Sequence, residues 1–326
     1  MKILIDVFGC DNPDSVIEGL ANAINQLPQV ELIACGDASL IAESLSGIQF
    51  DRSRLEILDA PEVITNHEKP VYAIRTKKRS SLVVAYNALK ERDDIPIMIS
   101  AGSTGAVIAG AVLLLGRENR EDRPTLITCL PNDKGGFTCL ADCGANVDCR
   151  PEHYLQFARY ASSYAKSVYG IENARIGLLS VGTEDEKGNA VTKEAFALLK
   201  QSGLNFVGNM EAKSALSGDY DVIVADGFHG NILLKTIEGT AKSLICRTID
   251  LIKKHADKDT DLTFVKRAFK ELNGVIDFNS LGGAILLGAK KPIIKAHGSA
   301  NSDTVVNTVK QAIAMINSGL IINKGD

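Results

Sequence analysis

Residues 97–111 read IMISAGSTGAVIAGA and pass from a strand pattern, through a turn of Gly, Ser and Thr, into a helix pattern. The run before the turn is apolar and favours a strand, and the run after it has a pattern typical of a helix. A strand–turn–helix unit that repeats along a chain is typical of a parallel α/β sheet. The fold therefore depends on whether this unit recurs, and the function depends on what its turn holds.

The unit does recur along the chain. Runs that favour strands and end in turn residues lie at 2–7, 30–36, 55–60, 95–102, 125–131, 139–144, 175–182, 205–210, 221–227 and 292–298. Helix patterns lie between them: residues 14–27 follow Asn12 and Pro13, which suit a cap and a first turn, and residues 191–203 end at a Gly. This alternation predicts a single α/β domain, 1–326, with a mostly parallel sheet covered by helices on both faces.

Composition narrows the class of protein. The chain has 326 residues, 45% of them hydrophobic, a formal net charge of −4, and only 5% aromatic residues with no Trp. That balance argues against nucleic acid as a partner and favours a small-molecule or protein substrate. The N-terminus enters a strand pattern directly, and no apolar stretch approaches the roughly 20 residues of a transmembrane helix. We therefore expect a cytoplasmic protein.

The seven Cys residues are expected to be free thiols. Cys139, Cys143 and Cys149 cluster, and His153 follows. Their spacings, C-x3-C and C-x5-C, lack the paired knuckles of a zinc site. We therefore expect small buried residues around a tight loop, and no metal.

One segment, 247–280, interrupts the strand–helix alternation. Within it Leu262, Val265, Phe269 and Leu272 share one side of a predicted helix, and Lys266, Arg267 and Lys270 lie elsewhere. Such an amphipathic helix packs on a core or in a dimer interface, or it lies on an anionic membrane surface. A second basic stretch, 76–94, runs from an exposed turn into a helix.

Ligands of open α/β sheets bind outside the carboxyl ends of the strands. The polar residues that follow the predicted strands are therefore candidates for one site. They include Asp6, Asp11, Gly102, Ser103, Thr104, Asn146, Asp148, Lys187, Asp226, Asn231 and His297. We expect several of these loops to converge.

The turn at 102–105 has three interpretations. Gly102 and Gly105 let the backbone approach an anion, with the following helix N-terminus and the hydroxyls of Ser103 and Thr104 as donors. Alternatively, AGSTG is a degenerate nucleophile elbow with Ala101 in place of the first Gly. In the third interpretation Ser or Thr only caps the helix. The motif matches neither a Walker loop nor a dinucleotide fingerprint, so no nucleotide cofactor is expected.

Residues on the other loops also have a structural role as an alternative to a functional one. Asp148 orients a ligand or caps the helix that Pro151 starts. Lys187 neutralises a phosphate or belongs to a solvated hairpin. His229 more often faces solvent, whereas His297 follows an apolar strand, where a general acid or base would sit.

Taken together, the loops resemble those of PlsX-type phosphate acyltransferases of bacterial phospholipid synthesis. The matching stretches are AIRTKKRSSLVVA, SAGSTGA, DCGANVDCRPEHYLQFA, GLLSVGTEDEKGN, FVGNMEA, DGFHGNILLKTIEG and IKAHGS. The resemblance implies a Rossmann-like three-layer α/β/α fold similar to phosphotransacetylases. It implies transfer of a long-chain acyl group from acyl carrier protein to inorganic phosphate, with no cofactor. It also implies a homodimer, peripheral contact with the inner face of the membrane, and a glycerol-3-phosphate acyltransferase as a further partner.

Loop positions then suggest a role for each residue. Phosphate is assigned to Gly102, Ser103, Thr104 and Gly105, with Lys187 as its charge partner. Asn146 and Asn231 are candidate donors to the thioester oxygen, and His297 is a candidate for proton transfer. Asp6, Asp11, Asp148 and Asp226 are assigned to substrate binding on the remaining loops.

Three other functions stay open. A thioesterase would use Ser103, Asp226 and His297 as a triad in the order of α/β-hydrolases. A related phosphate acyltransferase would use coenzyme A in place of a carrier protein. A binding module for carrier protein or lipid would keep the fold without the reaction.

Overall fold

The computed structural model describes residues 1–256, 261–276 and 282–320. In this part of the chain one eleven-stranded sheet has the order β3-β2-β1-β4-β11-β10-β5-β6-β9-β7-β8. The strands are β1 (Lys2–Asp6), β2 (Glu31–Gly36), β3 (Leu55–Asp59), β4 (Met98–Ser100), β5 (Thr125–Pro131), β6 (Phe137–Ala141), β7 (Ile176–Ser180), β8 (Phe206–Glu211), β9 (Val222–Val224), β10 (Ala284–Leu287) and β11 (Ile293–Lys295). The ten strands expected from the sequence are present, and β10 is an additional one.

The sheet consists of two parallel blocks that run in opposite directions. Strands β1, β2, β3, β4 and β11 are mutually parallel, as are β6, β9, β7 and β8. Between the blocks, β10 is antiparallel to both β11 and β5, and β5 is antiparallel to β6. The strands of one block therefore have their carboxyl ends where the strands of the other block have their amino ends.

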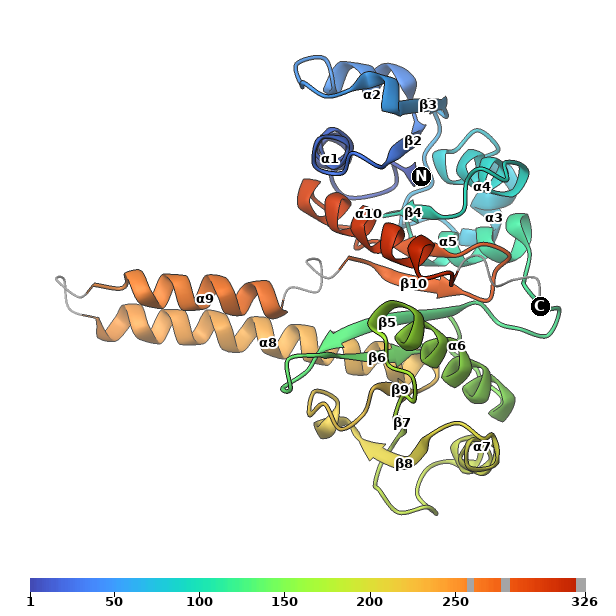
Figure 1. Cartoon of the computed structure of the whole chain (residues 1–326), viewed down its shortest axis with the longest axis vertical. Helices are drawn as coiled ribbons and strands as arrows, with labels where there is room; N and C mark the ends of the chain where they lie inside the picture. Colours follow the sequence, from blue (N-terminus) through green and yellow to red (C-terminus); the bar gives the residue numbers. More distant parts are fainter. Residues whose placement is uncertain (257–260, 277–281, 321–326) are drawn as a thin grey trace.

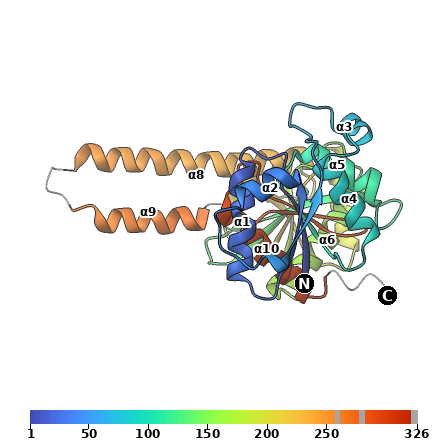
Figure 2. The ribbon, with the colours of Figure 1, turned by 90° about the horizontal axis from the view of Figure 1, so that it is seen from above.

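Helices cover both faces of the sheet, as predicted (Figures 1 and 2). The helices are α1 (Pro13–Gln26), α2 (Ala38–Ser44), α3 (Pro70–Thr76), α4 (Ser81–Glu91), α5 (Thr104–Gly110), α6 (Pro151–Tyr169), α7 (Ala190–Gln201), α8 (Gly227–His255), α9 (Thr263–Ile276) and α10 (Ser302–Asn317). One apolar core holds residues of α1, α2, α6, α7 and α10. The other holds residues of α3, α4, α5 and the first turns of α8. The result is a three-layer α/β/α fold.

Two helix ends lie where the capping residues of the sequence indicate. The Asn12 side chain accepts a hydrogen bond from the Ser15 N–H at the start of α1, and Pro13 is the first helical residue. Helix α7 ends just before Gly203, whose φ of +77° is the left-handed conformation that Gly adopts without strain. Both predicted helix boundaries are therefore confirmed.

An arm of two helices projects from the body (Figures 1 and 2). It begins within the long helix α8, and α9 packs back along it across a cavity of about 350 Å³ lined by Ile249, Ile252, Leu262, Val265 and Phe269 among others. Most of the apolar stripe predicted for α9 is therefore covered by α8. Leu251 and Phe264 remain exposed on the arm. No helix in the described ranges is long and apolar enough to cross a membrane.

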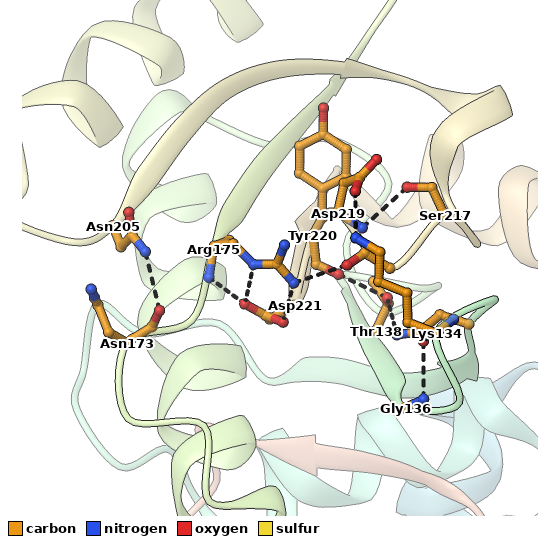
Figure 3. A network of polar contacts seen from close by, with 12 residues as sticks. Lys134, Gly136, Thr138, Asn173, Arg175, Asn205, Ser217, Asp219, Tyr220 and Asp221 are labelled. Carbon is orange, nitrogen blue, oxygen red and sulfur yellow. Dashed lines mark hydrogen bonds and ion pairs between the residues drawn. The ribbon is translucent and has the colours of Figure 1, made fainter.

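A polar network ties the second block together (Figure 3). Arg175, just before β7, makes two hydrogen bonds from its side chain to the Asp221 carboxylate, at 2.9 and 3.0 Å, and Asp221 also accepts the Arg175 N–H at 2.7 Å. The Lys134 Nζ lies 2.7 Å from the Asp219 carboxylate, and the Thr138 hydroxyl donates to the Tyr220 carbonyl. The β5–β6 hairpin is thus held against the segment that leads into β9.

Candidate functional site

A cavity of about 610 Å³ lies where the two blocks meet. Its polar part is formed by the segments that follow β1, β4 and β11, together with the first turns of α8. Its apolar part is formed by β5, the start of β10 and the end of α6. The cavity therefore draws on both halves of the sheet.

Hydrogen bonds brace the turn at 102–105 from beneath. The Ser100 hydroxyl donates to Asp6 Oδ2 at 2.7 Å and accepts the Gly102 N–H at 3.1 Å. A Cβ on Gly105 would lie 2.8 Å from Pro70 Cγ, so Gly is needed there for the close approach of α3. Gly102 and Thr104 line the cavity, and the Ser103 side chain makes no capping hydrogen bond.

The geometry of Ser103 does not match a nucleophile elbow. That motif holds its Ser in a strained turn, whereas the φ of Ser103 is −50° and no non-Gly residue in the described part of the chain has a positive φ. Ser103 occupies the cap position of α5 without the side-chain bond that the capping interpretation predicts. These observations argue against the elbow and against a side-chain cap by Ser103, and the anion cradle stays a prediction.

The most informative residue of the cavity, Lys295, was missed by the sequence analysis. It is the last residue of β11, pairs with Ser100 of β4, and is only 9% exposed. Its Nζ donates to the carbonyls of Ala101, at 3.5 Å, and Ala296. Burial lowers the pKa of Lys295 to about 8, and the charge of Asp6 opposes that shift. Lys295 thus brings a cation to the cavity wall directly behind the turn.

Asp6 lies beneath the turn and does not line the cavity. It is 1% exposed, and burial raises its pKa to about 6, while the Ser100 hydroxyl and the charge of Lys295 work in the opposite direction. Its Oδ1 is buried without a hydrogen-bond partner. Asp6 therefore acts on the site through Ser100 and Lys295, and it is not placed to touch a substrate.

His297 lines the cavity and has a defined tautomer. Its Nδ1 lies 2.7 Å from the Ser299 hydroxyl and accepts the Ser299 N–H at 3.3 Å. Because Nδ1 is an acceptor, the proton of the neutral ring is on Nε2. Burial, followed by the positive charge of Lys235, lowers the pKa of His297, so the neutral form predominates at neutral pH. Asp11 also lines the cavity, and its N–H donates to the Gly298 carbonyl at 2.9 Å.

The role predicted for Asn146 is wrong. Its amide nitrogen donates to the Pro124 carbonyl at 2.8 Å and to Asp142 Oδ2 at 2.9 Å, which uses both N–H donors. Asn146 is buried and does not line the cavity. It holds the loop after β6, and cannot offer a donor to a thioester oxygen. Asn231, the other candidate, does line the cavity from α8.

Asp226 is also placed differently from expectation. It caps α8 through the His229 N–H, and its Oδ2 lies 2.7 Å from His229 Nδ1 and accepts the Tyr154 hydroxyl at 2.9 Å. It does not contact His297, whose Nδ1 is occupied by Ser299. The hydrolase triad of Ser103, Asp226 and His297 is therefore not assembled.

Two further candidates lie outside the cavity. Lys187 is exposed on the loop after β7, whose carboxyl end lies at the edge opposite to that of β4 and β11. Asp148 is exposed and neither caps α6 nor lines the cavity; α6 begins after Arg150, whose backbone N–H donates to His153 Nδ1 at 3.0 Å. Strand direction alone does not explain why Lys187 is absent from the site, because the start of α8 follows β9 of the same block and lines the cavity; β7 lies one strand further from the junction of the blocks than β9.

Comparison with known proteins gives one consistent family. The family model described as "Fatty acid synthesis protein" matches residues 1–323. A phosphate acyltransferase of Clostridioides difficile is 43% identical over 314 residues, covering 96% of this chain and 92% of its own length. One from Clostridium acetobutylicum is 42% identical over 322 residues, covering 98% and 97%.

Among solved structures, a phosphotransacetylase from Streptococcus pyogenes superposes with a TM-score of 0.62. The two chains are 16% identical, and the match covers 99% of this chain and 94% of the other. At that level of identity the similarity establishes the fold. It agrees with the three-layer architecture described above.

Proposed function

The chain belongs to the family of fatty acid synthesis proteins whose curated relatives are phosphate acyltransferases, and from this premise we propose that it transfers a long-chain acyl group from acyl carrier protein to inorganic phosphate. Acyl transfer to phosphate is the activity of the family. The carrier-bound thioester as the acyl donor, and the residues that act on it, are our assignment. The observation that carries the assignment is a buried lysine, Lys295, in a cavity that also holds the turn at 102–105.

Phosphate is assigned to the polar part of the cavity. The Thr104 N–H at the start of α5 and the hydroxyls of Ser103 and Thr104 are assigned as donors, and Gly102, whose N–H is bound to the Ser100 hydroxyl, lets phosphate approach the backbone. The positive charge beside phosphate, expected from Lys187, is assigned to Lys295, which lines the cavity. Because Lys295 is buried, its interaction with a dianion is screened less than that of an exposed lysine.

The acyl chain is assigned to the apolar part of the cavity. Ile127 and Ile285 are buried on β5 and β10, and Cys129 and Tyr169 continue the same wall. An alkyl chain placed there gains the free energy of removing apolar surface from water, about 25 cal/mol per Å². The thioester carbon then lies between this wall and the phosphate.

The reaction needs one displacement. A phosphate oxygen forms a bond with the thioester carbon, the carbon–sulfur bond breaks, and the carrier thiolate takes up a proton from solvent. The residues of the cavity contribute position and electrostatics, because a thiolate is already a good leaving group. Asn231 and the Nε2–H of His297 are candidate donors to the oxygen that becomes negative. No acyl-enzyme is required.

We also propose how the molecule is situated. It acts as a homodimer in the cytoplasm and touches the inner face of the membrane through the exposed apolar residues of the arm, Leu251 and Phe264. There it would pass acyl phosphate to a glycerol-3-phosphate acyltransferase.

The test is a phosphate titration with palmitoyl-acyl carrier protein. We expect free carrier thiol to appear only when phosphate is present, with a saturable dependence and equal amounts of acyl phosphate. Release of thiol at the same rate without phosphate would support a thioesterase instead. Equal kcat/KM values for palmitoyl-coenzyme A and the carrier substrate would favour the coenzyme A alternative.

A further inference from the structure

A cationic patch on and beside helix α3 has no role in the site described above. We name it the α3 patch and define it as Lys69, Val71, Tyr72, Arg75 and Lys78. Tyr72 is 68% exposed and Val71 is 48% exposed, which is unusual for side chains of this size. Tyr72 and Arg75 are three residues apart and therefore neighbours on the surface of α3, and Lys69 is exposed at its N-cap position.

The positive charge of the patch is not neutralised within the chain. The neighbouring Lys77 pairs with Glu68 at 2.8 Å, and Arg79 reaches Asp59 at 3.8 Å. In the described part of the chain, Lys69, Arg75 and Lys78 have no carboxylate within ion-pair distance, and Lys78 Nζ reaches only the Ile74 carbonyl at 3.5 Å. This excess of positive charge lies on a chain whose formal net charge is −4.

The α3 patch is next to the mouth of the cavity. Asn66, three residues before Lys69, lines the cavity. Pro70, the first residue of α3, packs against Gly105 in the phosphate turn, where a Cβ would lie 2.8 Å from its Cγ. A macromolecule seated on α3 would therefore hold a flexible arm within reach of the phosphate turn.

We propose that the α3 patch is the docking surface for the acidic face of the acyl carrier protein, an inference that rests on the proposed function. The substrate thioester is attached to a protein, so the protein part needs a surface close to the cavity. Lysine and arginine side chains around an exposed Tyr match an acidic partner in charge and give it an aromatic anchor. Charge complementarity of this kind chiefly affects the rate of association and the apparent affinity.

The experiment uses the double variant Arg75→Glu/Lys78→Glu in the full chain. With palmitoyl-acyl carrier protein we expect KM to rise at least tenfold with kcat nearly unchanged. With palmitoyl-pantetheine, which lacks the protein part and its charge, we expect kcat/KM to stay within twofold of the wild type. The matched control is Arg159→Glu/Lys193→Glu, which reverses two exposed charges on α6 and α7, on the opposite face of the sheet.

Direct binding separates this inference from the proposed function. Calorimetry with holo-acyl carrier protein requires no turnover, and we expect affinity to fall at least tenfold in the double variant and in Tyr72→Ala. Unchanged affinity for the carrier protein in both variants would overturn the inference. An equal loss of affinity in the control variant, or an equal loss of kcat/KM with palmitoyl-pantetheine, would overturn it as well. Loss of binding to anionic vesicles with carrier affinity intact would identify the patch as a lipid contact instead. Absence of phosphate-dependent activity in the wild type would overturn the proposed function, whatever the binding result.

Discussion

Lys295 is the residue on which the proposed chemistry depends most. A second lysine, Lys291, lies just before the same strand and offers a natural comparison. Its Nζ donates to the carbonyls of Leu89, Arg92 and Ile95 at 2.8 to 2.9 Å and does not line the cavity. One lysine is thus placed to bind an anion, and the other ties β11 to the end of α4.

We predict that Lys295→Met raises KM for phosphate about tenfold to a hundredfold, because a hydrogen bond to a charged group contributes about 1.5–3 kcal/mol. Lys291→Met is expected to lower the melting temperature with KM for phosphate unchanged. Steady-state kinetics and thermal unfolding of both variants check this. A KM for phosphate that is equal in Lys295→Met and the wild type would remove Lys295 from the phosphate site.

The pH dependence follows from the lowered pKa of Lys295. A lysine with a pKa of about 8 carries its charge below that pH and loses it as pH rises. We therefore predict that kcat/KM for phosphate, calculated on the concentration of the dianion, is highest below about pH 7 and falls as pH rises through about 8. In Lys295→Met this fall should be absent. A fall of equal size in the variant would assign the titration to another group.

Ser103→Ala provides a test of the turn. If the hydroxyl is one donor among several, we expect kcat/KM to fall by no more than the factor of about a hundred to a thousand that a single donor contributes. Near-complete loss, together with an acylated Ser103 detected by mass spectrometry of the wild type, would favour the nucleophile interpretation.

At the scale of single residues, position after a strand was enough to predict which loops meet, and the roles of the residues on them stay predictions. Gly102, Thr104, Asp11, Asn231 and His297 were all predicted, and all line one cavity. Lys295 was missed because it lies within an apolar strand, and only the residues after strands were considered. A lysine in the run PIIKA is nevertheless a signal, because lysine is rarely buried without a reason.

For Asn146 and Asp226 the competing partners come from tertiary structure. Pro124 and Tyr154 occupy their polar atoms, and neither partner is adjacent in the sequence. Asn146 and Asp226 therefore looked available for a ligand in the sequence and are occupied in the fold.

At the scale of elements, strands and helices were predicted better than their directions. β10 was missed because its four residues lie between glycines, Gly283 and Gly288. The reversal at β5–β6 could have been predicted, since only residues 132–136 separate the two strands, which is too short for a parallel crossover. The amphipathic insertion expected at 247–280 begins earlier, because α8 continues from the cavity into the arm, and residues 257–260 and 277–280 of that range lie outside the described residues.

The exposed apolar residues of the arm lead to a prediction about binding to vesicles. Leu251→Asp with Phe264→Asp should lower co-sedimentation with anionic vesicles at least fivefold and leave activity on soluble substrate unchanged, because neither residue lines the cavity. Ser243→Asp with Ala268→Asp adds the same charge at exposed positions of the arm and keeps the apolar residues. Equal vesicle binding by the two double variants would rule out an apolar contact through these side chains.

At the scale of the whole molecule, the site requires both halves of the sheet to keep their relative positions. The cavity joins the segments at the ends of β4 and β11 in one block to the start of α8, which follows β9 of the other block, across β10 and β5 between them. The network around Arg175 and Asp221 holds the second block together, and neither residue lines the cavity (Figure 3). Stability and chemistry are therefore separable by mutation.

We predict that Asp221→Asn lowers the free energy of unfolding by about 1–3 kcal/mol through weakened charged hydrogen bonds. Burial acts to raise the pKa of Asp221, but the hydrogen bonds and charge of Arg175 outweigh it, so the net pKa is lowered. This stabilisation is present above the unfolded value near 3.8 and is lost as pH falls through the folded pKa. Denaturant unfolding of the wild type and of Asp221→Asn at pH 7 and pH 3 measures this contribution. A difference in free energy of unfolding between the two proteins that is larger at pH 3 than at pH 7 would contradict the account.

The central claim is that phosphate, and not water or a protein side chain, receives the acyl group. It is tested most directly by one turnover of palmitoyl-acyl carrier protein in ¹⁸O-labelled water with unlabelled phosphate, followed by mass spectrometry of product and protein. The account predicts palmitoyl phosphate without ¹⁸O and a protein of unchanged mass. Palmitate that carries ¹⁸O as the first product, or a protein heavier by one palmitoyl group, would contradict it.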